Sequence, residues 1–170
     1  MPLTMYEVSI PQLERSLRNL SAILDKSVAH ASQRKIDPQV LLGMRLYPDM
    51  FPLVRQVQTA TDFAKAIASR LAGRDPPKWD DTEKTFDELK VRIDKALTIL
   101  AAAKPEDFEG SETREITLSP GGRTVKLTGN DYLLRFALPN FYFHVTTAYD
   151  ILRHAGVELG KVDFIGTLSS

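Results

Sequence analysis

The stretch NFYFHVTTAYDILRH, residues 140–154, holds the side chains best suited to chemistry. At 100° per residue, the longer helix that contains this stretch and its neighbouring residues places polar and apolar residues together on one inward face. These residues are Leu133, Phe136, Asn140, His144, Thr147, Ile151 and Ala155. An inward imidazole can act as a general base, bind a metal, or stay neutral in a hydrogen bond inside the core. We keep these three interpretations of His144 open, with Asn140, Tyr142 or Tyr149 as the groups that would assist catalysis.

The other two histidines and the clustered carboxylates have simpler structural interpretations. His30 lies at the edge of an apolar helix face, and His154 falls in a last helical turn, where the helix dipole favours a cation. Asp80, Asp81 and Glu83 form an acidic cluster at the expected start of a helix. We interpret this cluster as a solvated helix start, because negative charge is favoured there.

Four amphipathic helices are expected to position these groups. They cover residues 9–31, 51–71, 82–103 and 128–154. The first has Ser9 as a candidate N-cap and Pro11 in its first turn, followed by leucines at three- and four-residue spacing. A short helix should follow Asp37 on the way to the second. Pro139 lies inside the fourth and should kink or split it.

Between the third and fourth helices the hydrophobic period changes. In ETREITLSPGGRTVKLTG, apolar residues alternate with polar ones on both sides of Pro120-Gly121-Gly122. Period two around such a turn predicts a β-hairpin, with the glycines supplying positive φ. The glycines lack the spacing of a phosphate-binding loop. A lone hairpin is marginal in water, so we expect it to pack against the helices.

Composition limits the classes of function. The 170 residues suit one domain, residues 1–170, and 22 basic against 22 acidic residues give no net charge. A neutral chain has no general attraction to phosphate backbones or anionic lipids, so we expect no nucleic-acid or membrane partner. The absence of cysteine excludes disulfides and thiolate zinc sites. No apolar run approaches the ~20 residues of a bilayer span, and no signal peptide is evident, so we expect a cytoplasmic protein.

Three stretches carry a family resemblance: MYEVSIPQLERSLRNLSAILDKS, LYPDMFPL and NFYFHVTTAYDILRHAGVELGKVDFIG. Together they resemble a branch of the DinB-like (YfiT-like) superfamily that is known only as a domain of unknown function, and the similarity extends over nearly the whole chain. The resemblance implies a mainly all-α four-helix bundle, with the small β-hairpin between its third and fourth helices. It also implies a pocket mouth at Tyr47, Asp49 and Phe51 opposite His144, with Thr147 and Ala148 in the lining.

Many members of that superfamily resemble metalloproteins with three histidines, one from the second helix and two at H-x-x-x-H spacing in the fourth. His144 matches the first of the pair, but Ala148 stands at the second position and residues 51–71 contain no histidine. The nearest substitutes in that helix are Gln56, Gln58 and Asp62. The metal triad is therefore incomplete, and a divalent metal such as Zn or Ni would need His144 together with Asp49 or Asp62.

Three functions follow from these observations. The first is a non-enzymatic or degenerate bundle that has lost its metal site and serves as a small-molecule binder or a dimer. The second is an enzyme that uses His144 as a general base in an aromatic pocket. The third is a metal-dependent thiol transferase or hydrolase with carboxylate ligands beside His144. Related bundles commonly pair through helix faces, which implies a homodimer, although no expected helix carries a second apolar stripe.

Overall fold

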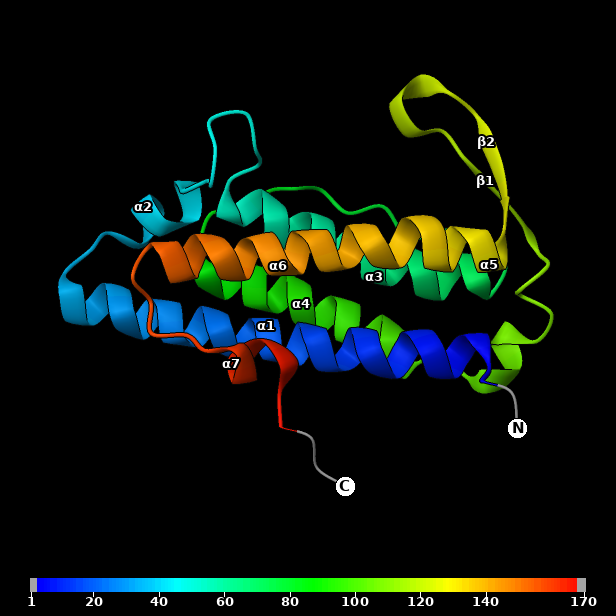
Figure 1. The fold of residues 1–170 in the computed structure, drawn as a ribbon, viewed down its shortest axis with the longest axis horizontal. Coiled ribbons are helices and arrows are strands. Elements are labelled where there is room, and N and C mark those ends of the chain that lie inside the picture. Colours follow the sequence, from blue (N-terminus) through cyan, green and yellow to red (C-terminus); the bar gives the residue numbers. More distant parts are fainter. Residues whose placement is uncertain (1–2, 168–170) are drawn as a thin grey trace.

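Four long helices run side by side in the computed structural model, which describes residues 3–167 (Figure 1). They are α1 (Met5–Arg34), α3 (Leu53–Leu71), α4 (Phe86–Ala101) and α6 (Leu138–His154). Helix α3 packs most extensively on α6 and α4, and α1 packs on α4 and more lightly on α6. Leucines at helical spacing on α1, among them Leu13, Leu17 and Leu20, are completely buried in the shared core. The predicted four-helix bundle is confirmed.

Helix α1 begins four residues earlier than predicted. Thr4 is its N-cap, because its hydroxyl accepts from the Glu7 N–H while the Glu7 carboxylate accepts from the Thr4 N–H. Ser9, the predicted cap, lies inside the helix and donates its hydroxyl to the Met5 carbonyl at 2.6 Å. Pro11 therefore lies in the helix interior, where its missing N–H removes one backbone hydrogen bond.

Helices α3 and α4 are shorter than predicted. Pro52 precedes the first residue of α3, and α4 starts at Phe86 rather than at residue 82. A second capping box decides the start of α4: Thr85 accepts from the Glu88 N–H, and the Glu88 carboxylate accepts from the Thr85 N–H. The segment 72–85 is consequently an extended connection that runs along α3 instead of a helical turn.

The predicted hairpin is present and projects from one end of the bundle (Figure 1). Strands β1 (Glu115–Leu118) and β2 (Val125–Thr128) pair antiparallel, with Ile116 opposite Leu127. Ile116 is buried, whereas most of β2 is exposed. Both glycines of the intervening turn η2 (Pro120–Gly122) have positive φ, as the sequence pattern requires.

Pro139 does not split the last long helix, but the helix is irregular just before it. Thr128 caps a single turn, α5 (Gly129–Asp131), which continues into the π-helical segment η3 (Tyr132–Ala137) and then α6. The Leu138 N–H bonds to the Leu133 carbonyl, five residues back instead of four. A proline inside a helix leaves a carbonyl without its donor, and this wider turn accommodates the defect without ending the helix.

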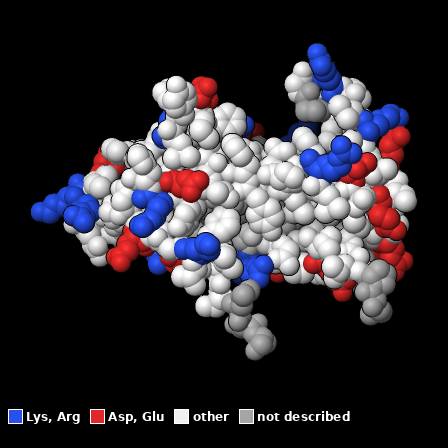
Figure 2. All heavy atoms as spheres, in the orientation of Figure 1, with Lys and Arg blue, Asp and Glu red and all other residues white. Residues whose placement is uncertain are grey.

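Short elements complete the chain. They are α2 (Pro38–Gly43), which packs on α3, α7 (Lys161–Ile165), which packs on α1, and the turn η1 (Pro105–Phe108). Within residues 3–167, no helix combines the length and the apolar character needed to cross a membrane. In Figure 2 both signs of charge gather toward the two ends of the viewed face, and the middle of α6 is largely uncharged.

Candidate functional site

The His144 ring lies between α6 and α3, where 8% of the residue is exposed. Its Nδ1 is 2.7 Å from Oε1 of Gln56, and the Gln56 amide in turn donates from Nε2 to the Phe51 carbonyl at 3.0 Å. Because this second bond fixes the amide with its oxygen toward the ring, Nδ1 of His144 must carry the proton. The lone pair of the neutral imidazole is therefore on Nε2.

Three phenylalanine rings surround this imidazole. Phe51 and Phe63 lie nearly parallel to it, with centroids 6.4 Å and 6.0 Å away, in the offset arrangement that aromatic rings favour. Phe143 meets it edge-on at 5.2 Å. Phe51 and Phe143 are about half exposed, so these two rings flank the side of the imidazole that faces solvent.

Nε2 of His144 is accessible to solvent. Among the described residues, Ser111 Oγ is the only side-chain nitrogen or oxygen that is sealed from solvent without a hydrogen-bond partner. Since Nε2 has no partner in the described part of the chain, it must reach solvent. The large surface hollows lie elsewhere, one of about 770 Å³ beside Gly156–Gly160 and one of about 720 Å³ beside Asp75–Asp80. His144 lines neither of these two hollows.

Burial sets the charge of this imidazole. It lowers the pKa of His144 from 6.5 to about 4, and the positive charge of Arg55 adds to the effect. The ring is consequently neutral at pH 7. A neutral imidazole whose pKa lies three units below the working pH is a good hydrogen-bond acceptor but a weak general base.

The polar residues predicted to assist His144 are turned toward their own helix. Asn140 donates from its amide to the Phe136 carbonyl at 2.7 Å, and Thr147 donates from its hydroxyl to the Phe143 carbonyl at the same distance. Such bonds to a carbonyl one turn back satisfy a polar group locally. These contacts join Asn140 and Thr147 to their own helix and not to the His144 ring.

The remaining predicted residues lie at different depths. Tyr142 is half-buried and packs edge-on against Phe141, and Tyr149 is half-buried against Phe164. Ala148 is completely buried, while Tyr47 and Asp49 are exposed on the connection before α3. Of the predicted pocket mouth, the structure brings Phe51 into contact with His144. The sequence analysis missed Phe63 as a ring neighbour and Gln56 as the hydrogen-bond partner, although it had singled out Gln56 as a substitute ligand.

The donors around His144 do not fit a three-histidine metal centre. Gln56 faces His144 from α3, but its amide oxygen is already bonded to the imidazole, and Ala148 has no donor atom. Asp62 is bonded instead to Lys65 at 2.7 Å and to Arg92 at 2.8 Å. Within residues 3–167, no three His, Cys, Asp or Glu side chains converge as metal ligands do.

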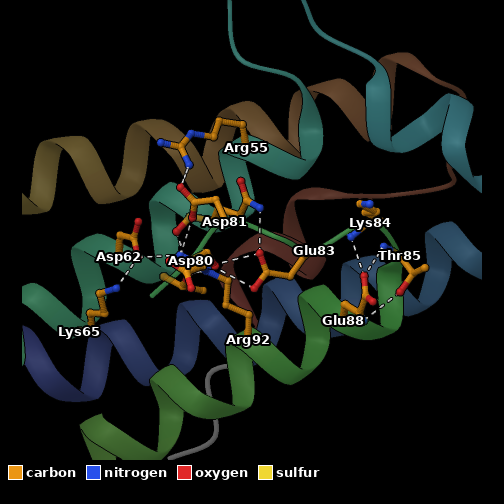
Figure 3. Close-up of polar contacts among 12 residues, drawn as sticks. Arg55, Asp62, Lys65, Asp80, Asp81, Glu83, Lys84, Thr85, Glu88 and Arg92 are labelled. Carbon is orange, nitrogen blue, oxygen red and sulfur yellow. Dashed lines mark hydrogen bonds and ion pairs between the residues drawn. The ribbon is translucent and has the colours of Figure 1, made fainter. Parts of the chain in front are cut away.

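A buried arginine organises the neighbouring side of α3 (Figure 3). The side chain of Arg92, on α4, is 1% exposed. Its guanidinium bonds to the side chains of three acidic residues and one threonine and to one backbone carbonyl. The partners are Asp62 at 2.8 Å, Asp81 at 2.9 Å, Glu83 at 3.0 Å, Thr61 at 2.9 Å and the Asp80 carbonyl at 3.0 Å. Hydrogen bonds to Thr61, the Asp80 carbonyl, Glu83 and Asp62 satisfy four of the five N–H donors, and Asp81 adds an ion pair beside the fifth, so the buried charge is compensated.

The interpretation of Asp80, Asp81 and Glu83 as a helix start was wrong, although Asp80 and Asp81 are exposed as expected. Asp81 and Glu83 pair with Arg92, and Asp80 supplies its backbone carbonyl, because α4 starts later and segment 72–85 folds over α3. One signal was available in the sequence. Arg92 occupies a core position of the apolar stripe of α4, where an arginine needs acidic partners.

The Arg92 cluster reaches the His144 site through Asp81. That carboxylate also pairs with Arg55, and the Arg55 guanidinium lies 5.5 Å from the centre of the Phe51 ring. On the other side, Lys65 lies 4.0 Å over the Trp79 ring. Segment 72–85 is thus fastened along α3 by ion pairs and one aromatic ring, and its Asp81 is linked through Arg55 to the Phe51 ring beside His144.

The fold is a four-helix bundle in which α3 and α4 run in the same direction, because segment 72–85 returns along α3 (Figure 1). With a hairpin before its last long helix and a buried histidine on that helix, it has the architecture of a DinB-like bundle. The chain is similar to a crystal structure of a DinB family member protein from Shewanella denitrificans: they share 44% identity and a TM-score of 0.92 over 97% of this chain and 93% of that one. The family model described as "Domain of unknown function (DUF1993)" matches residues 5–165, and the chain belongs to this family. No curated protein matches it.

Proposed function

We propose that this family member binds a small molecule at His144 without a metal ion. The hydrogen bond between His144 Nδ1 and Gln56 Oε1, at 2.7 Å, is the observation that carries the proposal. It commits the Gln56 amide oxygen to the imidazole and leaves Nε2 of His144 as a free acceptor. Within the described residues, no group of three His, Cys, Asp or Glu side chains is placed to hold an ion at that atom. The residue one turn on, Ala148, contributes packing in place of a ligand atom.

The geometry specifies the kind of molecule. Nε2 of His144 requires an N–H or O–H donor, and the flanking rings of Phe51 and Phe143 favour a flat, apolar body. Both rings are about half exposed, so they can change rotamer on a fast timescale. Such a change would widen the space beside the imidazole and admit the small molecule. Binding is favoured over acid–base catalysis because the low pKa of His144 leaves a weak base at neutral pH.

Metal content tests the proposal. Protein purified without an affinity tag should contain no stoichiometric Zn or Ni by mass spectrometry, before or after dialysis against either ion. The double variant Gln56→His/Ala148→His restores the three histidines and should gain about one ion per chain, which shows that the assay detects this site. Adding His144→Ala to that variant should remove the ion again.

A bound metal ion would contradict the proposal. Stoichiometric metal in the unaltered protein that is lost on His144→Ala would overturn the proposal. It would favour the metal-dependent thiol transferase or hydrolase instead, and Asp49→Asn and Asp62→Asn would then show which carboxylate takes part.

A further inference from the structure

We propose that Arg55 anchors a carboxylate of the ligand, so that the pocket takes small, flat hydroxy acids; this inference rests on the proposed function. The acid group would bind the guanidinium at the rim, and the hydroxyl would donate to His144 Nε2 at the base. Phe51 neighbours both Arg55 and His144 and would support the apolar body of the ligand.

The position of Arg55 is the first support. Its guanidinium lies 5.5 Å from the Phe51 ring centre, and that ring lies 6.4 Å from the His144 ring centre. The Arg55 side chain is 38% exposed and the neighbouring Phe51 ring is about half exposed, so solvent reaches both. Its positive charge also contributes to the lowered pKa of His144, which places it within electrostatic reach of the imidazole.

The partner of Arg55 can be exchanged. Arg55 pairs with the Asp81 carboxylate, which lies 2.9 Å from Arg92 as well. When a ligand carboxylate takes Arg55, Asp81 keeps its bond to Arg92 and is not left as an unpaired charge. The other two basic residues of the cluster cannot serve in this way, because the Lys65 side chain is 8% exposed and paired with Asp62, and the Arg92 side chain is 1% exposed.

Charge balance favours a carboxylate over a more highly charged group. Three basic side chains, Arg55, Lys65 and Arg92, face three acidic ones, Asp62, Asp81 and Glu83, in this cluster. A monoanion adds one negative charge beside Arg55, whose planar fork matches a carboxylate in two parallel bonds. A dianion such as a phosphate ester would add a second charge close to Asp81 with no further cation to compensate it.

Matched acids and amides test this inference. The probes are 4-hydroxybenzoate and 4-hydroxyphenylacetate, each against its primary amide, which keeps the hydroxyl and the ring but removes the charge. Binding is followed by NMR through the ring nitrogens of His144, which report contact at Nε2. The proteins are the unaltered chain, Arg55→Gln and Asp81→Asn. A charge-matched control is Lys126→Gln, in the hairpin at the far end of the bundle (Figure 1).

The acids should bind the unaltered protein about tenfold or more tightly than the amides, the usual value of a charge-assisted bond. Arg55→Gln should abolish that preference, Lys126→Gln should leave it intact, and Asp81→Asn should strengthen acid binding because a competitor is removed. A purely structural Arg55–Asp81 pair would not produce that gain. If amides and acids change the NMR chemical shifts of the His144 ring nitrogens equally, the carboxylate inference is wrong, but the proposal that His144 binds a small molecule is supported. If neither changes these chemical shifts, both proposals fall.

Discussion

Replacing Arg92 by methionine tests whether the charge cluster holds segment 72–85 on α3. Methionine keeps much of the buried volume but removes every donor of the guanidinium. Asp62 would keep Lys65, and Asp81 would keep Arg55, as partners. Glu83 would lose its cation and retain the Gln58 amide, which donates to it at 2.8 Å. The substitution therefore leaves one carboxylate, 13% exposed, without a compensating charge.

Breaking a buried ion pair by removing one partner costs about 3 to 5 kcal/mol. Since two of the three carboxylates keep a cation, we expect the lower end, about 3 kcal/mol. For a chain of this length that corresponds to a fall in Tm of about 6 to 12 °C. Adding Glu83→Gln to Arg92→Met should recover part of the lost stability, because it removes the unpaired charge. The recovery should be incomplete, because the hydrogen bonds of Arg92 are not restored.

The assay is urea unfolding followed by circular dichroism, with Lys95→Met as the control. Lys95 is exposed on the same helix, so its replacement should change the free energy of unfolding by no more than about 0.5 kcal/mol. Burial raises the pKa of Glu83, but hydrogen bonds from Gln58 and Arg92 outweigh it and hold the pKa below 4.5. Its stabilisation is therefore present above pH 4.5, and the difference between Arg92→Met and the unaltered protein should shrink below that pH. A loss under 1 kcal/mol at pH 7 would refute the assigned role.

Three further predictions concern stability. Burial lowers the pKa of His144 from 6.5 to about 4, so the stability that the neutral ring confers is complete above pH 6.5. The free energy of unfolding should fall by about 3 kcal/mol toward pH 4. In urea unfolding, His144→Gln should flatten this part of the pH profile. Thr85→Ala removes the cap of α4 and should cost about 1 kcal/mol, or 2 to 4 °C in Tm; an unchanged Tm would show that the cap contributes nothing. A Cβ at Gly129 would lie 1.8 Å from the Ser111 carbonyl oxygen, so Gly129→Ala should lose about 2 kcal/mol or more, whereas Gly43→Ala, whose Cβ meets nothing within 4 Å, should not.

The sequence by itself determined the helices, the hairpin and the family. Apolar spacing predicted each long helix, because one face must be buried whatever its neighbours are. The same spacing predicted that His144 faces inward, and it is 8% exposed. The apolar pattern predicted the helix starts less well. Thr4 and Thr85 each form a capping box with the glutamate three residues later, and these local pairs, not the residues chosen from the apolar pattern, set where α1 and α4 begin.

Only the tertiary structure decided what His144 and Arg92 contact. Gln56 is 88 residues away from His144 in the sequence, and it faces the imidazole because of how far α3 is shifted and rotated against α6. Arg92 meets Asp62 and Asp81 because segment 72–85 folds back along α3. A periodic pattern reports which face of a helix is buried, but it does not encode the axial register between two packed helices. Hydrogen-bond partners depend on that register to within an ångström or so, and they are therefore set by the packing of the whole chain.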